Sequence, residues 1–259
     1  IGEYAGLVAG ASLMVDYVLT VAVSISAGVA AIVSIPAFSG LQDQRVPLGV
    51  ALIVLITLAN MRGVKESGRI FAIPTYVYML VLGALIVVGL GQSFLGDGAT
   101  VPFDPKAFDG SLQSGGSLGI FLLLKGFSSG AVALTGVEAI SNGVPAFRRP
   151  ESKNAATTLV WMGVLLGSLF LGVRVPPPPL KPSPSHDRTV MAQMGLAVFG
   201  NGPMFVLLQF ATAAILTLAA NTAYNGFPSL SSIIAKDGYL PRQLAHRGDR
   251  LVFSNGIIV

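Results

Sequence analysis

The sequence predicts an all-α membrane protein, and three observations lead to this fold class. Hydrophobic residues make up 53% of the 259 residues, charged residues make up only 11%, and the mean hydropathy is +0.73. Soluble domains carry about 25% charged residues. Several apolar runs also reach the ~20 residues that a helix needs to cross a hydrocarbon core of ~30 Å. We therefore expect a lipid bilayer to be the main partner of the chain.

Each apolar run is expected to be a transmembrane helix, because none shows the alternation of a barrel strand and an unpaired strand would leave backbone polar groups in lipid. The runs cover roughly 4–35, 47–61, 70–94, 118–147, 155–173 and 203–228. Together they predict one transmembrane domain over 1–259. The chain begins at Ile1 without Met and stops where apolar character returns, so we interpret it as an internal fragment.

The loops between the spans predict the orientation of the chain. When they are placed on alternate sides, one side receives ten Lys and Arg residues and the other receives five. The positive-inside rule assigns the richer side to the cytoplasm. Loops 62–69, 148–154 and 236–252 of a multi-pass cell membrane protein are therefore expected to be cytoplasmic, and the first span is expected to run outward.

The segment 174–202 is predicted to be a proline-rich external loop. It contains four consecutive prolines at 176–179, and prolines in series remove backbone donors and cannot continue a helix. A rigid polyproline linker and a local sequence error are both open interpretations of its composition.

A polar seam runs along the first span. Ser12, Asp16, Thr20 and Ser24 recur every four residues, so a helix places them on one slowly drifting stripe beside Tyr17. An acid in mid-bilayer is costly and is by default a functional candidate. The stripe predicts oxygen ligands for an alkali cation or a proton relay. The alternative is that Asp16 only pairs with another helix for stability.

The fourth span is expected to be a broken helix near 135–138. It carries glycines at 130, 136 and 143, each of which weakens a helix by about 1 kcal/mol relative to alanine. Carbonyls at the break, with the Thr135 hydroxyl and the Glu138 carboxylate beside Gly136, would suit a cation. The alternative is that the glycines serve packing and Glu138 is structural.

The remaining polar residues point to structure and not to catalysis. The sixth span carries Gln209, Thr212, Thr217, Asn221, Thr222, Tyr224 and Asn225, for which we expect hydrogen bonds between helices. The two histidines lie in loops without a second metal ligand. No phosphate-binding loop or nucleophile elbow is present. The sequence therefore predicts no enzyme, no catalytic residue, no cofactor and no nucleic-acid partner.

Three strings carry a resemblance to a known family: Gly10–Ser24, Leu134–Asn142 and Arg247–Gly256. They resemble the amino acid-polyamine-organocation (APC) superfamily and, more narrowly, KimA-type potassium transporters, many of whose relatives are labelled amino acid permeases. The likeness covers almost the whole chain apart from about 173–186. It implies a LeuT-type bundle of inverted five-helix repeats, of which this chain would hold helices three through eight and the first residues of nine.

The resemblance also implies a site and a transport mechanism. Asp16, Thr20, Ser24, Thr135 and Glu138 would inherit ligand or coupling roles with Tyr17 and Gly136 close by, and the monovalent cation itself would be held by Asp16, Thr20, Thr135 and Glu138. The implied mechanism is proton-coupled potassium symport, with potassium and protons as cargo. The parts of the family fold outside this chain include the first helix and a tail through which members form homodimers. An amino acid permease, or a non-functional fragment of either, remains the alternative.

Overall fold

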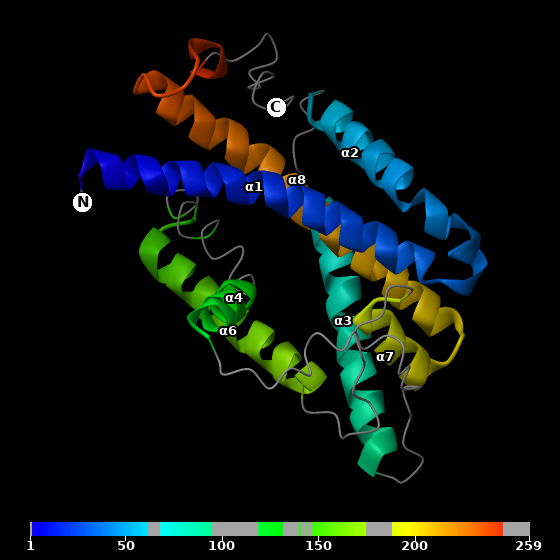
Figure 1. Ribbon diagram of the computed structural model, residues 1–259. Coiled ribbons are helices and arrows are strands. Elements are labelled where there is room, and N and C mark those ends of the chain that lie inside the picture. The colour runs from blue at the N-terminus through cyan, green and yellow to red at the C-terminus, as the bar shows by residue number, and fades with distance from the viewer. Residues whose placement is uncertain are drawn as a thin grey trace.

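The computed structural model describes residues 2–61, 68–94, 119–131, 140, 144, 147–174 and 188–245. Its helices, in chain order, are α1 (Glu3–Val33), the 3₁₀ segment η1 (Pro36–Gln44), α2 (Arg45–Met61), α3 (Gly68–Phe94), α4 (Ile120–Ala131), α6 (Glu151–Arg174), α7 (Val190–Phe199), α8 (Pro203–Lys236) and the short η6 (Arg242–Ala245) (Figure 1). The described residues contain helices and no strand. The predicted all-α class is confirmed.

Five stretches within the described residues are long and apolar enough to cross a membrane: Glu3–Val33, Pro36–Met61, Ala72–Gln92, Glu151–Gly172 and Pro203–Lys236. Each overlaps one of the apolar runs. α8 extends to Lys236, beyond the expected end at 228, although it contains Pro228. Of the expected span 118–147, the structure describes the helix Ile120–Ala131. The predicted break at 135–138 lies outside the described residues.

The prediction of a loop throughout 174–202 is wrong for residues 190–199, which form helix α7. The Thr189 hydroxyl accepts a hydrogen bond from the Ala192 amide at 3.1 Å and caps the first turn. Gly200 ends the helix with φ of +63°. The prolines that suggested a loop all precede residue 185, so they do not disturb this helix, whose apolar side is buried.

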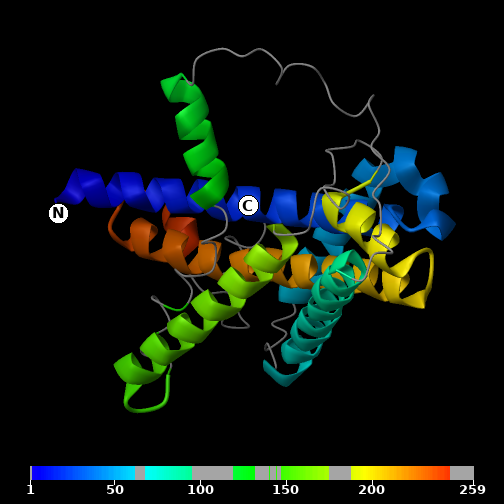
Figure 2. The same ribbon diagram turned by 90° about the horizontal axis from the view of Figure 1, so that it is seen from below.

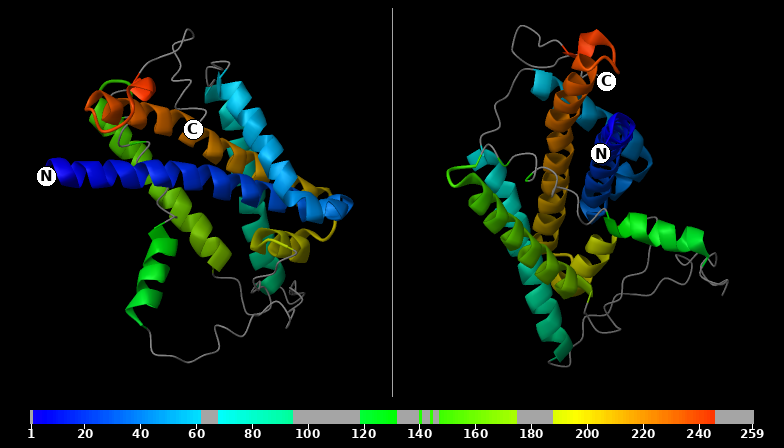
Figure 3. Two further views of the ribbon diagram at one scale, coloured as in Figure 1. Left: turned by 45° about the horizontal axis from the view of Figure 1, so that its top comes forward. Right: turned by 90° about the vertical axis from the view of Figure 1, so that its left-hand side faces the viewer.

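Helices α1 and α8 form the central pair of the fold and pack along much of their length (Figures 1 and 3). Small residues allow the close approach. A Cβ atom at Gly10 would lie 3.1 Å from Cδ1 of Ile234, and one at Gly28 would make ordinary contact with Ala213 at 3.6 Å. The first contact joins the start of α1 to the end of α8, and the second joins the end of α1 to the start of α8. The two helices are therefore antiparallel.

Two hydrophobic clusters position the other helices around this pair. Helix α2 packs on α1 through a cluster that contains Ile25, Val29, Val33, Ile56 and Ala220. Helices α3 and α7 pack on α8 through a second cluster that contains Val81, Leu82, Leu85, Met194, Val198 and Leu208. A Cβ atom at Gly195 would lie 2.7 Å from Cδ2 of Leu208. A glycine at this position thus lets α7 lie directly on α8.

Helices α4 and α6 have few contacts within the described residues and project from the α1–α8 pair (Figure 2). Only 6% of the apolar window of α6 is buried. Phe121 and Phe127 on α4 are each 78% exposed, and Trp161 on α6 is 63% exposed. In a bilayer such apolar surface is compatible with lipid or with further helices of a longer chain.

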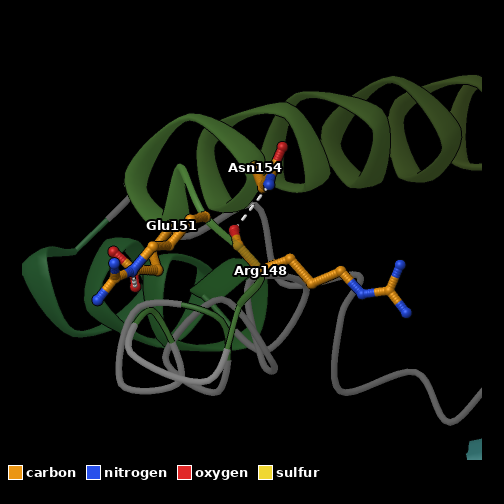
Figure 4. Close-up of polar contacts among 4 residues, drawn as sticks. Arg148, Glu151 and Asn154 are labelled. Atoms are coloured by element: carbon orange, nitrogen blue, oxygen red, sulfur yellow. Dashed lines mark hydrogen bonds and ion pairs between the residues drawn. The ribbon is translucent and has the colours of Figure 1, made fainter.

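The start of α6 is held by one side-chain hydrogen bond. Nδ2 of Asn154 donates to the backbone carbonyl of Arg148 at 2.8 Å, and the side chain of Arg148 extends away from Glu151 and Asn154 (Figure 4). Nε of Arg149 lies 3.7 Å from Oε1 of Glu151, and these two side chains are 94% and 43% exposed. An ion pair in such an exposed place contributes little to stability. The basic side chains at this helix end therefore remain accessible.

Candidate functional site

Asp16 lies near the middle of α1, which runs from Glu3 to Val33. At a rise of ~1.5 Å per residue, the acid is ~20 Å from one end of the helix and ~26 Å from the other. Its side chain is exposed. A charged acid at the centre of a bilayer costs at least ~2.5–3.5 kcal/mol unless protein or water surrounds it. This face of α1 is therefore a poor lipid-facing surface.

The polar stripe of α1 turns from an exposed to a buried position along the helix. Ser12 and Asp16 are exposed, Thr20 is half-buried, and Ser24 is buried at 8% exposure. Each step of four residues advances the direction by about 40° beyond a full turn, which explains the change. Asp16 and Ser24 are also ~12 Å apart along the helix axis. They cannot bind the same ion at the same time, whereas Asp16 and Thr20 are only ~6 Å apart.

Tyr17 points toward α8 and not along the stripe. A Cβ atom at Gly226 of α8 would lie 2.5 Å from Cζ and 2.9 Å from Oη of the Tyr17 ring. The ring therefore lies directly on the backbone of α8 at a residue without a side chain. Neighbouring residues of a helix point about 100° apart, so Asp16 faces a different direction from this contact.

Four polar side chains connect α2 and α8, and we refer to them as the α2–α8 polar layer. The Thr57 hydroxyl lies 2.9 Å from the Tyr224 hydroxyl, and Nδ2 of Asn60 donates to Oδ1 of Asn221 at 2.7 Å. The expected hydrogen bonds between helices are thus confirmed for Asn221 and Tyr224. Sequence analysis missed the α2 members, although a threonine and an asparagine three residues apart on an apolar helix are a usable signal.

The three threonines and Gln209 of α8 take part in no described hydrogen bond to another helix. The hydroxyls of Thr212, Thr217 and Thr222 donate to carbonyls of their own helix. Gln209 is completely buried, and its amide oxygen and nitrogen have no hydrogen-bond partner within the described part of the chain. The described hydrogen bonds of the three threonines thus stay within α8, contrary to the expectation, and for Gln209 a hydrogen bond between helices stays a prediction.

The α2–α8 polar layer lies at about the same level as Asp16. Helices α1 and α2 are joined by η1 and run in opposite directions (Figure 1). A Cβ atom at Gly49 would lie 3.9 Å from Cγ2 of Ile25, so position 57 of α2 comes level with position 17 of α1. The contact of Tyr17 with Gly226 brings α8 to the same level. Three helices thus contribute polar groups at one depth.

The predicted partners of Asp16 on the fourth span, Thr135, Gly136 and Glu138, lie outside the described residues. Lys125, which belongs to the same span, is on the exposed surface of α4. The structure therefore describes the α1 half of the predicted site. Within that half Asp16 and Thr20 lie on adjacent turns of α1, Tyr17 points toward α8, and Ser24 lies two turns from Asp16.

Comparison with known proteins covers the whole chain. Residues 1–259 match the amino acid permease family. The chain is 48% identical over 259 residues to a protein named potassium transporter KimA from Bacillus subtilis (strain 168). The aligned region covers all of this chain and 42% of that protein. It is 28% identical over 249 residues to a probable potassium transport system protein Kup from Pseudomonas entomophila (strain L48). That aligned region covers 93% of this chain and 35% of the relative.

The similarity extends to a third relative, a probable potassium transport system protein Kup 2 from Sinorhizobium medicae (strain WSM419), at 28% identity over 241 residues. The chain spans less than half the length of the curated relatives it matches. The resemblance to the amino acid-polyamine-organocation superfamily is confirmed by the match along all 259 residues and by the similarity to KimA. Together with the five membrane-length stretches, these findings show a multi-pass membrane protein, and the chain belongs to the amino acid permease family.

Proposed function

We propose that the full-length parent of this chain is a secondary active transporter that takes up potassium together with protons. The observation that carries the proposal is the 48% identity, over every residue of the chain, to a protein named as a potassium transporter. The more distant relatives are also named as potassium transport proteins. The membrane-length helices of the chain agree with a transporter and give no support to an enzyme.

The proposed cation site lies where the polar stripe of α1 meets the fourth span. Potassium gives up water only where oxygen ligands replace it. Asp16 and Thr20 supply a carboxylate and a hydroxyl from adjacent turns of α1, and both lie near the middle of that helix. Thr135 and Glu138 would complete the coordination, with Tyr17 and Gly136 beside them. Ser24, one to two turns further along, would serve the ion at another point of its path.

The same acids are the proposed basis of proton coupling. A carboxylate that takes up a proton from one side of the membrane and gives it to the other changes the charge of the site, and this change alters its affinity for a cation. Two carboxylates in one site would titrate together. Potassium and protons would thus be cargo, and no resident cofactor is required. Dimerisation of the parent rests on the family resemblance alone.

An amino acid permease is the second candidate, because the matched family carries that description. In that case the broken fourth span would bind the amine or carboxylate of the substrate, and Glu138 would stabilise the break. The names of the curated relatives favour potassium. A fragment without transport activity is the third candidate, since the chain covers only 42% of KimA.

Competition experiments separate these candidates. We expect the full-length parent to restore growth of a potassium-auxotrophic strain at low potassium and to take up rubidium as a potassium substitute. Excess potassium should suppress rubidium uptake by at least tenfold, because both ions need the same oxygen ligands, while an equal excess of any amino acid leaves uptake unchanged. Uptake of a labelled amino acid that potassium does not affect would contradict the proposal and favour the permease.

The proposed orientation places loops 62–69, 148–154 and 236–252 in the cytoplasm. The exposed arginines at the start of α6 (Figure 4) agree with this assignment, because basic residues accumulate on the cytoplasmic side of membrane proteins. The segment η1 between α1 and α2 then lies on the outer side, together with the proline-rich part of 174–202.

Single cysteines test this orientation, and this chain offers a clean background because it contains no cysteine. We expect Ser39→Cys, in exposed η1, to react in intact cells with a maleimide that does not cross membranes. Ser152→Cys, at the exposed start of α6, should react only after the cells are opened. Other cysteines of the full-length parent are replaced beforehand, and reaction of position 152 in intact cells would reverse the orientation.

A further inference from the structure

We propose that Gly226 of α8 is a positioning residue for the cation site, because it forms the surface on which the ring of Tyr17 rests. This inference deepens the proposed function and rests on it. Asp16 and Tyr17 are consecutive residues of α1, so a contact that fixes the tyrosine also fixes the direction in which the acid points. Gly226 does not touch the proposed cation and acts only through Tyr17.

The contact between Tyr17 and Gly226 is closer than any other side chain at position 226 would allow. A Cβ atom there would lie 2.5 Å from Cζ, 2.6 Å from Cε1 and 2.9 Å from Oη of the tyrosine. Carbon atoms in van der Waals contact are ~3.5–4.0 Å apart. Even alanine would therefore push the aromatic ring away by about 1 Å or more, and the ring cannot yield as a flexible chain end does.

The backbone of α8 is held firmly on the opposite side of this contact. Two residues before Gly226, the Tyr224 hydroxyl lies 2.9 Å from the hydroxyl of Thr57 on α2. One turn earlier, Asn221 accepts a hydrogen bond from Asn60 at 2.7 Å. The α2–α8 polar layer thus ties α8 to α2, which itself packs on α1. An added methyl group at position 226 would therefore displace the tyrosine more readily than the helix.

The local sequence of α8 around this glycine is unfavourable for a helix. Gly226 and Pro228 both lie inside a helix that continues to Lys236. Glycine costs about 1 kcal/mol and proline about 3 kcal/mol relative to alanine in a helix interior. Phe227, which lies between these two residues, and Pro228 itself are buried. A weak helix-forming sequence at the level of the candidate site is consistent with a requirement for close approach to Tyr17.

The contact between the Tyr17 ring and Gly226 sets the rotation of α1 about its own axis. Because helical residues advance by about 100° each, a tyrosine held on α8 turns Asp16 about 100° away from this contact, and Thr20, three residues after Tyr17, about 60° away toward the same side. The contact thus sets the direction in which both oxygen ligands point. Displacement of the ring would rotate or tilt this section of α1 and move both oxygen ligands together.

Gly226→Ala in the full-length parent tests the proposal. We expect KM for rubidium uptake to rise about tenfold, within the range of coupling energies of residues in contact, while the amount of protein in the membrane stays the same. Gly28→Ala is the matched control on the same helix pair, because its Cβ atom would make only ordinary contacts of 3.6 to 3.8 Å. Its KM should remain within about twofold of the parent. An equal rise in both variants would overturn the proposal.

A double-mutant cycle separates action through Tyr17 from a general packing effect. Tyr17→Leu removes the ring, so Gly226→Ala should then raise KM by less than about twofold over Tyr17→Leu alone. If Gly226→Ala has its full effect in the Tyr17→Leu background, the glycine does not act through the tyrosine and the proposal fails.

A spectroscopic readout distinguishes this failure from failure of the proposed function. 3-Fluorotyrosine placed at position 17 reports the ring environment by ¹⁹F NMR in detergent, without transport. We expect Gly226→Ala to shift this resonance and Gly28→Ala to leave it in place. Unchanged spectra for Gly226→Ala would overturn the positioning role. A shifted spectrum together with rubidium uptake that survives Asp16→Asn would instead refute the cation site, and with it the functional part of the inference.

Discussion

Replacement of Asp16 by asparagine, or of Glu138 by glutamine, is expected to reduce rubidium uptake by the full-length parent by at least about tenfold. Both changes keep the size of the side chain and remove its charge and its ability to carry a proton. A hydrogen bond or ligand contact to a charged group contributes ~1.5–3 kcal/mol, so the loss of either acid should reduce uptake by at least about tenfold. If both acids serve one site, the double variant should be no worse than the weaker single variant.

The measurement is initial rubidium uptake in a potassium-auxotrophic strain, normalised to the amount of transporter in the membrane. Asp43→Asn is the matched control, because Asp43 is an exposed acid in η1 and lies outside the proposed site. It should transport as the parent does. Undiminished uptake by both Asp16→Asn and Glu138→Gln would refute the assignment of the site, and parallel loss in Asp43→Asn would show that the effect is not specific.

Leu208→Ala is expected to have the largest effect on stability. Leu208 of α8 is fully buried against α3 and α7. Its Cδ2 atom lies close to Gly195 on α7. Loss of a buried leucine side chain costs ~2–5 kcal/mol, of which part comes from the cavity that remains. The thermal midpoint of the purified parent in detergent, read by the loss of its monodisperse elution peak, should therefore fall by several degrees.

The neighbouring Leu207 provides the control for this experiment. It is 42% exposed on the same helix turn, so Leu207→Ala removes the same atoms without leaving a cavity. We expect its thermal midpoint to stay close to that of the parent. Equal losses for the two variants would show that α8 does not pack on α3 and α7 through the buried leucine.

The sequence predicted the long helices well because a bilayer leaves few alternatives. An apolar run that satisfies its own backbone must be helical, and the stretches Ala72–Gln92 and Glu151–Gly172 overlap two of the predicted spans. Helix α7 was missed because it is short and follows a run of prolines that dominated the local composition. Its burial against α3 and α8 depends on residues distant in sequence, which periodicity alone does not reveal.

For the candidate site, the four-residue repeat located Asp16 on α1, but it did not give the direction of each residue. The drift of the stripe, which buries Ser24 and leaves Asp16 exposed, follows from helix geometry once the packing of α1 is known. Thr57 and Gly226 escaped notice because their importance lies in pairing with Tyr224 and Tyr17 on other helices. The roles of Thr135 and Glu138 stay predictions.

The short length of α7 affects the expected number of membrane crossings of the chain. Its ten residues extend over only ~15 Å, about half of the hydrocarbon thickness. Helix α7 by itself is therefore too short to cross the membrane, and the proposed orientation expects the end of α6 and the beginning of α8 on the same face. Had α7 been a complete passage, every later segment would be on the opposite side, and Lys236 at the end of α8 and the arginines that follow it would change compartment.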